Sequence, residues 1–329
     1  MTLGKTHLII GGSGFIGCIL ARTLLDSTCK VVVVDDDTSQ RFDQQEQDFK
    51  SYSEYFSFKG NITHSKSQNW IRDVLQGQSV VIWHLAANSD IKTGSVSPDI
   101  DAEKTFMTSV AVCNLIEALN VTSVNFASTS AVYGELTVDS KQFSEEMLCD
   151  PISYYGAGKL ASEMFLKIAC ERKKVPLAVL RFANIVGSPA THGVIYDFIN
   201  KLVLDPNQLY VLGNGTQVKT YLHVKSLVEM MIKVETSKVG GIYNLSPGDE
   251  GIEVREIAEM VAVHYGTAPK IEYEAQSYGW VGDVVRVLMS NDKYCQRFGD
   301  HYFSSKDSIH KAIHEIFNQL SIPFFCHEI

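Results

Sequence analysis

The chain has 329 residues, of which 45% are hydrophobic and 20% charged, a composition typical of a globular protein of one or two domains. Acidic residues (38) outnumber lysine and arginine (29), and the formal net charge of −9 argues against a general affinity for nucleic acid or anionic membranes. No apolar run reaches the roughly 18 residues that a membrane span requires.

The N-terminal segment and the cysteines indicate the compartment. The first residues show no cationic segment followed by an apolar stretch and a cleavage site, so we expect no signal peptide. The seven cysteines are scattered, odd in number and form no C-x-x-C pair, which favours reduced thiols in the cytoplasm. His84, His192 and His223 are not spaced as metal ligands, and we expect no metal site.

Short β-branched runs alternate with helical patterns over the first half of the chain. We expect strands at 7–10, 31–34, 55–58, 80–83, 124–126 and 177–180. We expect helices near 15–26, 68–75, 103–119 and 155–172. Near-continuous apolar strands are typical of a parallel sheet that is buried on both faces. The sequence therefore predicts an α/β fold with a Rossmann-type doubly wound parallel sheet.

A glycine-rich loop follows the first strand directly. The strand at 7–10 leads into Gly11-Gly12-Ser13-Gly14-Phe15-Ile16-Gly17, and a helical pattern comes next. In such a loop the early glycines allow a tight turn and a close approach to a pyrophosphate, and the last one allows close packing of helix and strand. A glycine pattern between strand and helix predicts a dinucleotide site.

The second strand ends in Asp35, followed by Asp36 and Asp37. A carboxylate at this place can accept both ribose hydroxyls of a dinucleotide, and it would repel a 2′-phosphate. Asp35 is our choice for that role, and the sequence favours NAD over NADP.

Several motifs in this order and spacing carry a resemblance to a known family. Besides the glycine loop they are His84-Leu85-Ala86-Ala87, Ser128-Thr129-Ser130-Ala131-Val132-Tyr133-Gly134, Tyr155-Gly156-Ala157-Gly158-Lys159-Leu160, Arg181-Phe182-Ala183-Asn184-Ile185-Val186-Gly187, Gly213-Asn214-Gly215 and Tyr221-Leu222-His223-Val224. From about residue 6 to 290 the chain resembles the extended short-chain dehydrogenase/reductase family, in its UDP-glucose 4-epimerase-like branch that acts on nucleotide sugars.

The candidate catalytic residues are Tyr155, Lys159 and Thr129. Tyr155 and Lys159 begin a predicted helix, and residues four apart project from the same face. A free tyrosine has a pKa of about 10, and a neighbouring ammonium group would favour its phenolate and make it a usable base. Thr129 matches the family's Ser/Thr position, whose hydroxyl bridges the substrate oxygen and the tyrosine.

The resemblance implies further binding residues. For the cofactor NAD they are Gly11, Ser13, Gly14, Phe15, Ile16, Gly17, Asp35, Asp36, Asn61, Ile62, Leu85, Ala86 and Ala87, together with Tyr155 and Lys159. For a nucleotide-diphosphate sugar they are Thr129, Ser130, Asn184, Lys219, Trp280 and Arg286.

Some of these positions depart from the family pattern. Trp280 stands where relatives often have arginine, so either Arg286 replaces that cation or Trp280 stacks on a base or sugar. Lys219 also replaces a frequent arginine, and it would contact phosphate as a point charge without the arginine fork. The acidic pair that dehydratases carry after Thr129 is replaced by Ser130 and Ala131, which counts against 4,6-dehydration.

The resemblance implies an NAD-dependent nucleotide-sugar 4-epimerase that works through a transient 4-keto sugar. A 4-dehydrogenase that releases its keto product is the alternative, and a non-catalytic dinucleotide-binding sensor is a third possibility. Retention of Thr129, Tyr155 and Lys159 together argues against the sensor.

We expect two domains, which the chain enters more than once. Residues 1–183, joined by 218–247, are predicted to form the NAD-binding domain. Residues 184–217 and 248–329 are predicted to form a smaller α/β substrate-binding cap. The helices at 103–119 and 155–172 correspond to those that pair in dimeric relatives, so the resemblance also implies a homodimer.

Overall fold

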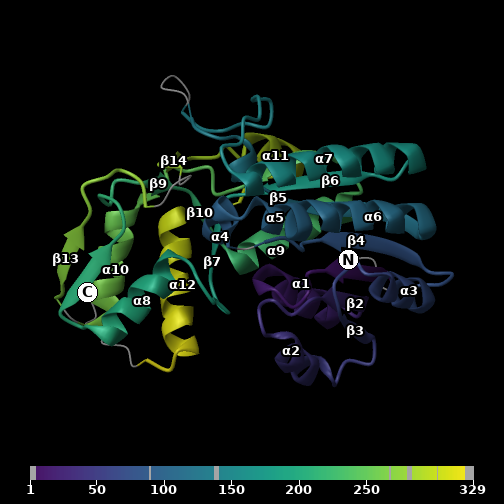
Figure 1. Ribbon diagram of the computed structural model, residues 1–329, viewed down its shortest axis with the longest axis horizontal. Helices are drawn as coiled ribbons and strands as arrows, with labels where there is room; N and C mark the ends of the chain where they lie inside the picture. The colour runs from purple at the N-terminus through teal and green to yellow at the C-terminus, as the bar shows by residue number, and fades with distance from the viewer. Residues whose placement is uncertain are drawn as a thin grey trace. The chain divides into compact units, whose positions relative to one another are not determined.

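The computed structural model describes residues 5–88, 90–136, 141–266, 268–279, 284–301 and 303–322 (Figure 1). The chain forms two compact units. Unit 1 consists of Met1–Val132, Pro151–Arg181 and Val228–Tyr243. Unit 2 consists of Tyr133–Asp150, Phe182–Leu227 and Asn244–Ile329. The assignment of an NAD-binding domain and a substrate cap to particular ranges stays a prediction.

A seven-stranded sheet in the order β11-β6-β5-β4-β1-β2-β3 organises the first half of the chain. Its strands are β1 (Thr6–Ile10), β2 (Lys30–Asp35), β3 (Tyr55–Lys59), β4 (Ser79–His84), β5 (Asn120–Thr129), β6 (Leu177–Phe182) and β11 (Gly241–Leu245). The central pairs β1–β2, β1–β4, β2–β3 and β4–β5 are parallel. The predicted Rossmann-type α/β class is therefore confirmed.

The strand register brings three predicted motifs to the carboxyl edge of this sheet. Ile10 pairs with Val34 of β2 and with His84 of β4. Beyond these pairs the Gly11 amide donates to the Val34 carbonyl, and the Leu85 and Ala86 amides donate to the Ile10 carbonyl (2.8 and 2.9 Å). The glycine loop, the end of β2 and the loop after β4 consequently start side by side, as a dinucleotide fold requires.

The helices of unit 1 follow the predicted alternation with local differences. They are α1 (Phe15–Asp26), α2 (Phe42–Phe49), α3 (Ser65–Val74), α4 (Ile91–Val96), α5 (Pro98–Asp101), α6 (Met107–Ala118) and α7 (Tyr154–Lys173), with a π-helical segment η1 (Ala102–Phe106) and a short 3-10 turn η2 (Ser130–Val132). The helix at 15–26 has its predicted bounds. The helix predicted at 103–119 is instead divided, because a π-helical segment precedes α6.

The core of unit 1 lies between this sheet and its helices. Leu8 and Ile10 of β1, Ile82 of β4 and Leu115 of α6 are buried in one cluster, together with Leu166 of α7. Since these strands are apolar on both faces, helices must cover both sides of the sheet. α6 and α7 pack against each other (Figure 1).

Unit 2 contains more regular structure than the sequence pattern indicates. Its strands are β7 (Asn184–Val186), β8 (Gln208–Val211), β9 (Val218–Lys219), β10 (Tyr221–His223), β12 (Ile252–Glu253), β13 (Lys270–Tyr273) and β14 (Arg286–Val287). The helices after residue 183 are α8 (Val194–Leu204), α9 (Val224–Ser237), α10 (Val254–Tyr265), α11 (Asp292–Phe298) and α12 (Ser305–Gln319). α9 begins in unit 2 and continues into unit 1.

Helices α8, α10 and α12 pack together around the core of unit 2. Ile199, Val261 and Ile313 are buried there, one from each helix. Their apolar residues recur at helical spacing, which explains why these segments fold as helices. Among the helices of the described residues, none is both long and apolar enough to span a bilayer.

Candidate functional site

The glycine loop has the shape that a dinucleotide requires. Gly11 has a φ of +84°, and a Cβ atom there would lie 2.6 Å from the Ala86 amide nitrogen. A Cβ atom on Gly17 would lie 2.3 Å from the Gly11 carbonyl oxygen. Any side chain at either position would therefore disrupt the turn or push α1 away from it.

The amino terminus of α1 presents open hydrogen-bond donors. Gly14 is the N-cap residue and provides no side-chain cap, and the first turn contains no acidic residue. The hydroxyl of Ser13 is buried and has no hydrogen-bond partner in the described part of the chain. Free amides, a positive helix end and an unused hydroxyl together fit a pyrophosphate, so the loop fits NAD. Phe15 and Ile16 form the first turn of this helix.

Asp35 lies buried at the end of β2. Its carboxylate accepts hydrogen bonds from the backbone amides of Ser13 (2.9 Å) and Asp37 (2.8 Å). Burial raises the pKa of Asp35, while these two amides oppose the rise. Asp35 thus holds the glycine loop, and its predicted role at the ribose stays a prediction. The Asp36 carboxylate instead accepts from the amide and hydroxyl of Thr38 in an exposed turn.

The other predicted cofactor residues surround the same edge of the sheet. Asn61 follows β3, and its side-chain oxygen accepts from the amide and hydroxyl of Thr63. The Ile62 side chain belongs to the apolar core, so only its backbone could face a ligand. Leu85, Ala86 and Ala87 continue from β4 beside the glycine loop. Their roles in binding NAD stay predictions.

Thr129, Tyr155 and Lys159 meet at the carboxyl end of β5. Thr129 is the last residue of β5. Ser153 caps α7 by accepting from the Gly156 amide (3.1 Å), which places Tyr155 in the first turn. The Thr129 hydroxyl lies close enough to the Tyr155 phenol to favour its ionised form. Lys159 Nζ lies 5.9 Å from the centre of the Tyr155 ring and donates to the Ala127 carbonyl (2.7 Å).

The electrostatics of this trio differ from a simple lysine-assisted phenolate. Burial raises the pKa of Tyr155 to about 12, the negative charge of Asp101 adds to the rise, and the Thr129 hydroxyl opposes it. Burial lowers the pKa of Lys159 to about 7, although Glu163 acts in the opposite direction. The phenol is therefore neutral at neutral pH and needs further positive charge before it can act as a base. NAD⁺ supplies such a charge when it is bound.

A buried ion pair lies one turn along α7 from Lys159. Glu163 is 1% exposed and Arg181 of β6 is 3% exposed. The guanidinium donates to both carboxylate oxygens (Nε at 3.0 Å and Nη2 at 2.7 Å), and the Ser128 hydroxyl donates to one of them (2.5 Å). The sequence analysis did not predict this pair, although Glu163 lies only four residues after Lys159.

The predicted sugar-nucleotide residues of unit 2 lie on small sheets. Asn184 begins β7, and its side-chain amide donates to the Thr220 carbonyl (3.2 Å). Arg286 of β14 pairs in register with Val218, and Val287 pairs with Lys219 of β9. Successive residues of a strand point to opposite faces, so Arg286 and Lys219 face opposite sides of this sheet. Only one of them can face a shared ligand. Trp280 lies outside the described residues.

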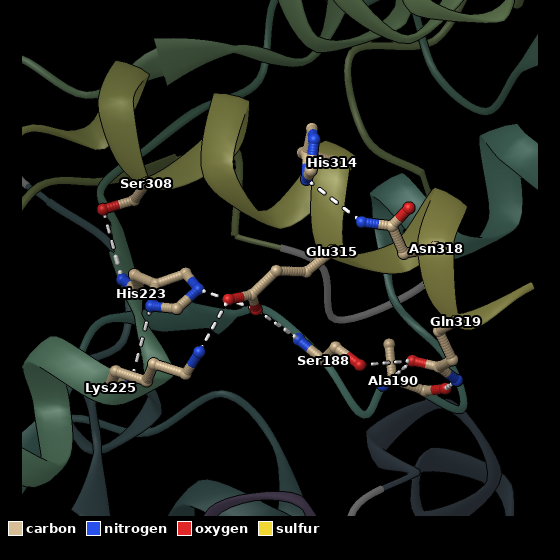
Figure 2. A network of polar contacts seen from close by, with 9 residues as sticks. All are labelled: Ser188, Ala190, His223, Lys225, Ser308, His314, Glu315, Asn318 and Gln319. Atoms are coloured by element: carbon tan, nitrogen blue, oxygen red, sulfur yellow. Dashed lines mark hydrogen bonds and ion pairs between the residues drawn. The ribbon is translucent and has the colours of Figure 1, made fainter. Parts of the chain in front are cut away.

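His223 takes part in a polar network with the last helix rather than in a site of its own (Figure 2). Glu315 of α12 accepts from His223 Nε2 (3.0 Å), from Lys225 Nζ (3.0 Å) and from the Ser188 amide (3.1 Å). Gln319 of the same helix accepts from the Ala190 amide (2.8 Å) and from the Ser188 hydroxyl (2.9 Å). The network connects α12 to β10 and to the loop after β7.

The fold and the site define a class: an α/β dinucleotide-binding protein with a Tyr–Lys pair at the carboxyl edge of its sheet. The comparisons with known proteins agree with this class. A family model described as "NAD dependent epimerase/dehydratase family" matches residues 7–246.

Curated relatives and a solved structure point the same way. The UDP-glucose 4-epimerase of Mycolicibacterium smegmatis is 25% identical over 292 residues, which is 87% of this chain and 90% of that protein. A UDP-N-acetyl-alpha-D-glucosaminuronate decarboxylase of Bacillus cytotoxicus is 30% identical over 277 residues, covering 78% of this chain and 79% of that protein. The crystal structure of a UDP-galactose 4-epimerase superposes with a TM-score of 0.81 at 27% identity, covering 96% of this chain and 100% of that chain.

The chain therefore belongs to the NAD dependent epimerase/dehydratase family, and it is an NAD-dependent enzyme. The predicted resemblance and the predicted cofactor are confirmed.

Proposed function

We propose that this protein is an NAD-dependent nucleotide-sugar 4-epimerase. The observation that carries the proposal is the meeting of Thr129, Tyr155 and Lys159 at the end of β5, without an acidic pair after Thr129. Elimination of water needs an additional acid and base, and Ser130 and Ala131 cannot supply them. The Ala131 amide instead donates to the Thr129 hydroxyl (3.2 Å), which helps to orient it.

In the proposed reaction Tyr155 takes the proton from the C4 hydroxyl of the sugar. NAD⁺, held at the glycine loop, would supply the hydride acceptor for oxidation at C4 and the hydride donor for reduction from the opposite face of the 4-keto sugar. Thr129 orients the C4 oxygen through its hydroxyl, and Tyr155 gives the proton back when the hydride returns. Lys159 holds positive charge beside the ring of Tyr155. Because the cofactor is regenerated in each cycle, no external NAD⁺ is consumed.

The deciding experiment follows anomeric-proton NMR spectra of UDP-, dTDP- and GDP-sugars incubated with the purified protein. Interconversion of two stereoisomers at many turnovers without added NAD⁺ is the expected result. Keto sugar that accumulates only in proportion to added NAD⁺ would instead favour the 4-dehydrogenase. No conversion of any sugar would contradict the proposed activity and favour the dinucleotide sensor.

Tyr155→Phe is the matching variant. It should lower turnover by roughly 10²–10⁴-fold, because it removes the proton-transferring group, while NAD binding is retained. Tyr154→Phe is the control, since the neighbouring Tyr154 is exposed and should leave turnover unchanged.

We also propose a homodimer formed through α6 and α7. Met107 of α6 and Met164, Phe165 and Ile168 of α7 expose apolar side chains, and Phe165 packs edge-on against Phe106 at 4.9 Å. Exposed apolar side chains on two packed helices are typical of an interaction surface. Analytical ultracentrifugation should show a dimer that Ile168→Asp converts to a monomer; a monomeric parent protein would contradict the proposal.

The cytoplasm is the compartment we propose. Cys18, Cys29, Cys113 and Cys170 are free thiols. Burial raises the pKa of all four. Such protonated thiols are unreactive and suit a reducing compartment. Fractionation of the source cells should place the protein with cytoplasmic markers.

A further inference from the structure

A buried carboxylate lies in the short helix α5, which packs against the catalytic helix α7, and neither the motifs nor the proposed mechanism gives it a role. Asp101 is the last residue of α5 and is only 2% exposed. Its Oδ1 atom accepts from Asn88 Nδ2 (3.0 Å) and from the Thr105 hydroxyl (3.3 Å). Its Oδ2 atom is buried and has no hydrogen-bond partner in the described part of the chain. A buried charge with only half of its acceptors used is costly, so it requires an explanation.

Asp101 is placed against both parts of the site. Asn88 directly follows the Leu85–Ala87 segment beside the glycine loop, and its amide donates to the Thr105 hydroxyl (3.1 Å). On the other side, α4, α5 and η1 pack against α7. A Cβ atom on Gly158 would lie only 3.7 Å from the Asp101 carbonyl oxygen, and Gly158 is one helical turn from Tyr155. The cluster thus connects the predicted cofactor loop to the catalytic helix.

The backbone around Asp101 supports a functional role for this residue. The π-helical segment η1 begins directly after Asp101, and such segments are frequent at functional sites. The missing side chain of Gly94 lets the backbone of α4 approach the carboxylate, since a Cβ atom there would lie 2.1 Å from Asp101 Oδ2. The carboxylate is therefore held tightly in place.

The other charged groups near Tyr155 do not duplicate this charge. On α7 itself, Lys159 is the cation beside the ring, and Glu163 is paired with Arg181. Asp99 of α5 and Glu103 of η1 are exposed, and Lys104 of η1 is half-buried. Thr129 faces the phenol from β5 as a neutral group. Asp101 is thus the buried, unneutralised anion among these groups.

We propose that Asp101 is a positioning residue: it braces the loop after β4 and opposes ionisation of Tyr155, so that the phenol loses its proton only when the positive charge of NAD⁺ is present. The inference rests on the proposed function for its catalytic meaning. This role explains why a buried charge with an unused acceptor atom is tolerated: the anion prevents a premature phenolate, and the bound cofactor offsets it. The rise in the pKa of Tyr155 that Asp101 adds to burial has the sign this arrangement requires.

The test is a pH titration of the Tyr155 phenol in the NAD-saturated protein. Ultraviolet difference absorbance between the protein and its Tyr155→Phe variant isolates this phenol and needs no substrate. Asp101→Asn should lower the titration midpoint by about one pH unit, because a nearby like charge is removed. The acid limb of the pH–rate profile should move in the same direction by the same amount.

Two matched variants distinguish the effect of the Asp101 charge from the effect of its hydrogen bonds. Asp99→Asn removes an exposed carboxylate of the same short helix and should leave the midpoint unchanged. Asn88→Ala breaks the hydrogen bond to Asp101 but keeps the charge, so its midpoint should not fall. If Asp101→Asn does not fold, Asp101→Ser takes its place as a smaller neutral residue.

The outcomes are decisive for Asp101 independently of the proposed function. A midpoint that stays in place in a folded neutral variant overturns the inference, even if epimerase activity is found. A midpoint that falls while no sugar is converted supports the role of Asp101 and contradicts the proposed activity. If neither neutral variant folds, Asp101 is a structural residue and the inference is wrong.

Discussion

Two of the charge networks in this molecule pair a glutamate with basic side chains and differ in their exposure to solvent. In unit 1, Glu163 and Arg181 are almost completely buried and joined by two hydrogen bonds. In unit 2, Glu315 is 19% exposed and its partner Lys225 is 54% exposed. Solvent screens the second network and leaves the first one in a low-dielectric interior. We therefore expect the Glu163–Arg181 pair to contribute more to the free energy of unfolding. We expect the Glu315 network to make the stability depend on pH.

Arg181→Met gives the largest expected effect, because it leaves the Glu163 carboxylate buried without its partner. The free energy of unfolding should fall by about 3–5 kcal/mol. Urea denaturation followed by circular dichroism measures this loss. Lys167→Met, which breaks an exposed pair on the same α7 helix, is the control and should change little.

A double variant sharpens this result. Replacing both members, Glu163→Leu with Arg181→Met, removes the unpaired charge and should recover much of the lost stability. If the double variant is as unstable as Arg181→Met alone, packing rather than charge accounts for the loss.

Lys159→Met should have the next largest effect: it should stabilise the protein and abolish its activity. Lys159 has a pKa of about 7 in the folded protein against 10.5 in the unfolded chain. The unfolded chain therefore binds more protons than the folded chain between about pH 7 and 10.5, so the stability of the protein rises with pH in that window. Below about pH 7 the burial of charged Lys159 destabilises the folded protein to its full extent. At pH 6.5 the methionine variant should be more stable by about 1–3 kcal/mol and inactive.

The gain in the Lys159→Met variant should shrink as the pH rises. Thermal unfolding at pH 6.5 and pH 10 measures the difference directly. An equal gain at both values would mean that side-chain packing, and not the lysine charge, is responsible.

Glu315→Gln tests the partly exposed network of unit 2 and should cost less. An amide keeps one acceptor oxygen for the three donors at Ser188, His223 and Lys225, so we expect a loss of about 1–2 kcal/mol. Lys306→Gln, exposed on the same helix, is the matched control. A loss as large as that of Arg181→Met would contradict the proposed contrast between the two networks.

His223→Gln gives the smallest effect, confined to acidic solution. Burial lowers the pKa of His223 below its ordinary value of 6.5, although Glu315 opposes the change. Below pH 6.5 the unfolded chain takes up a proton that the folded chain resists, so the parent protein loses stability as the pH falls. The variant should show a flatter dependence between pH 6.5 and 5 in chemical denaturation; an unchanged slope would assign the dependence to other groups.

The parallel sheet and its glycine loop could be predicted because most strands are short apolar runs and the turn after β1 carries its own glycines. The helix at 15–26 has the bounds that we predicted, because it starts directly after the glycine loop. The helix α2 was missed since Phe42 and Phe49 are its only large apolar residues. In unit 2 the helical spacing of Ile309, Ile313 and Phe317 was present in the sequence, but the loops around it obscured the pattern.

The candidate site was predictable only where its residues belong to recognisable motifs. The meeting of Thr129, Tyr155 and Lys159 followed from motifs that carry a strand end and a helix start. The contact between Asn88 and Asp101 depends on the path of α4 and α5, for which no local pattern exists. The pairing of Glu163 with Arg181 similarly requires the packing of α7 on β6. Contacts of this kind come from tertiary structure and not from a motif.

The position of β11 at the edge of the large sheet has a consequence for synthesis. β6 is complete at residue 182, but its outer neighbour β11 begins only at residue 241. While the ribosome makes the intervening segment, β6 presents an unpaired edge to which other chains can add. A nascent or truncated chain that stops before residue 241 should therefore aggregate or recruit chaperones, and slow translation of this segment would prolong the exposure.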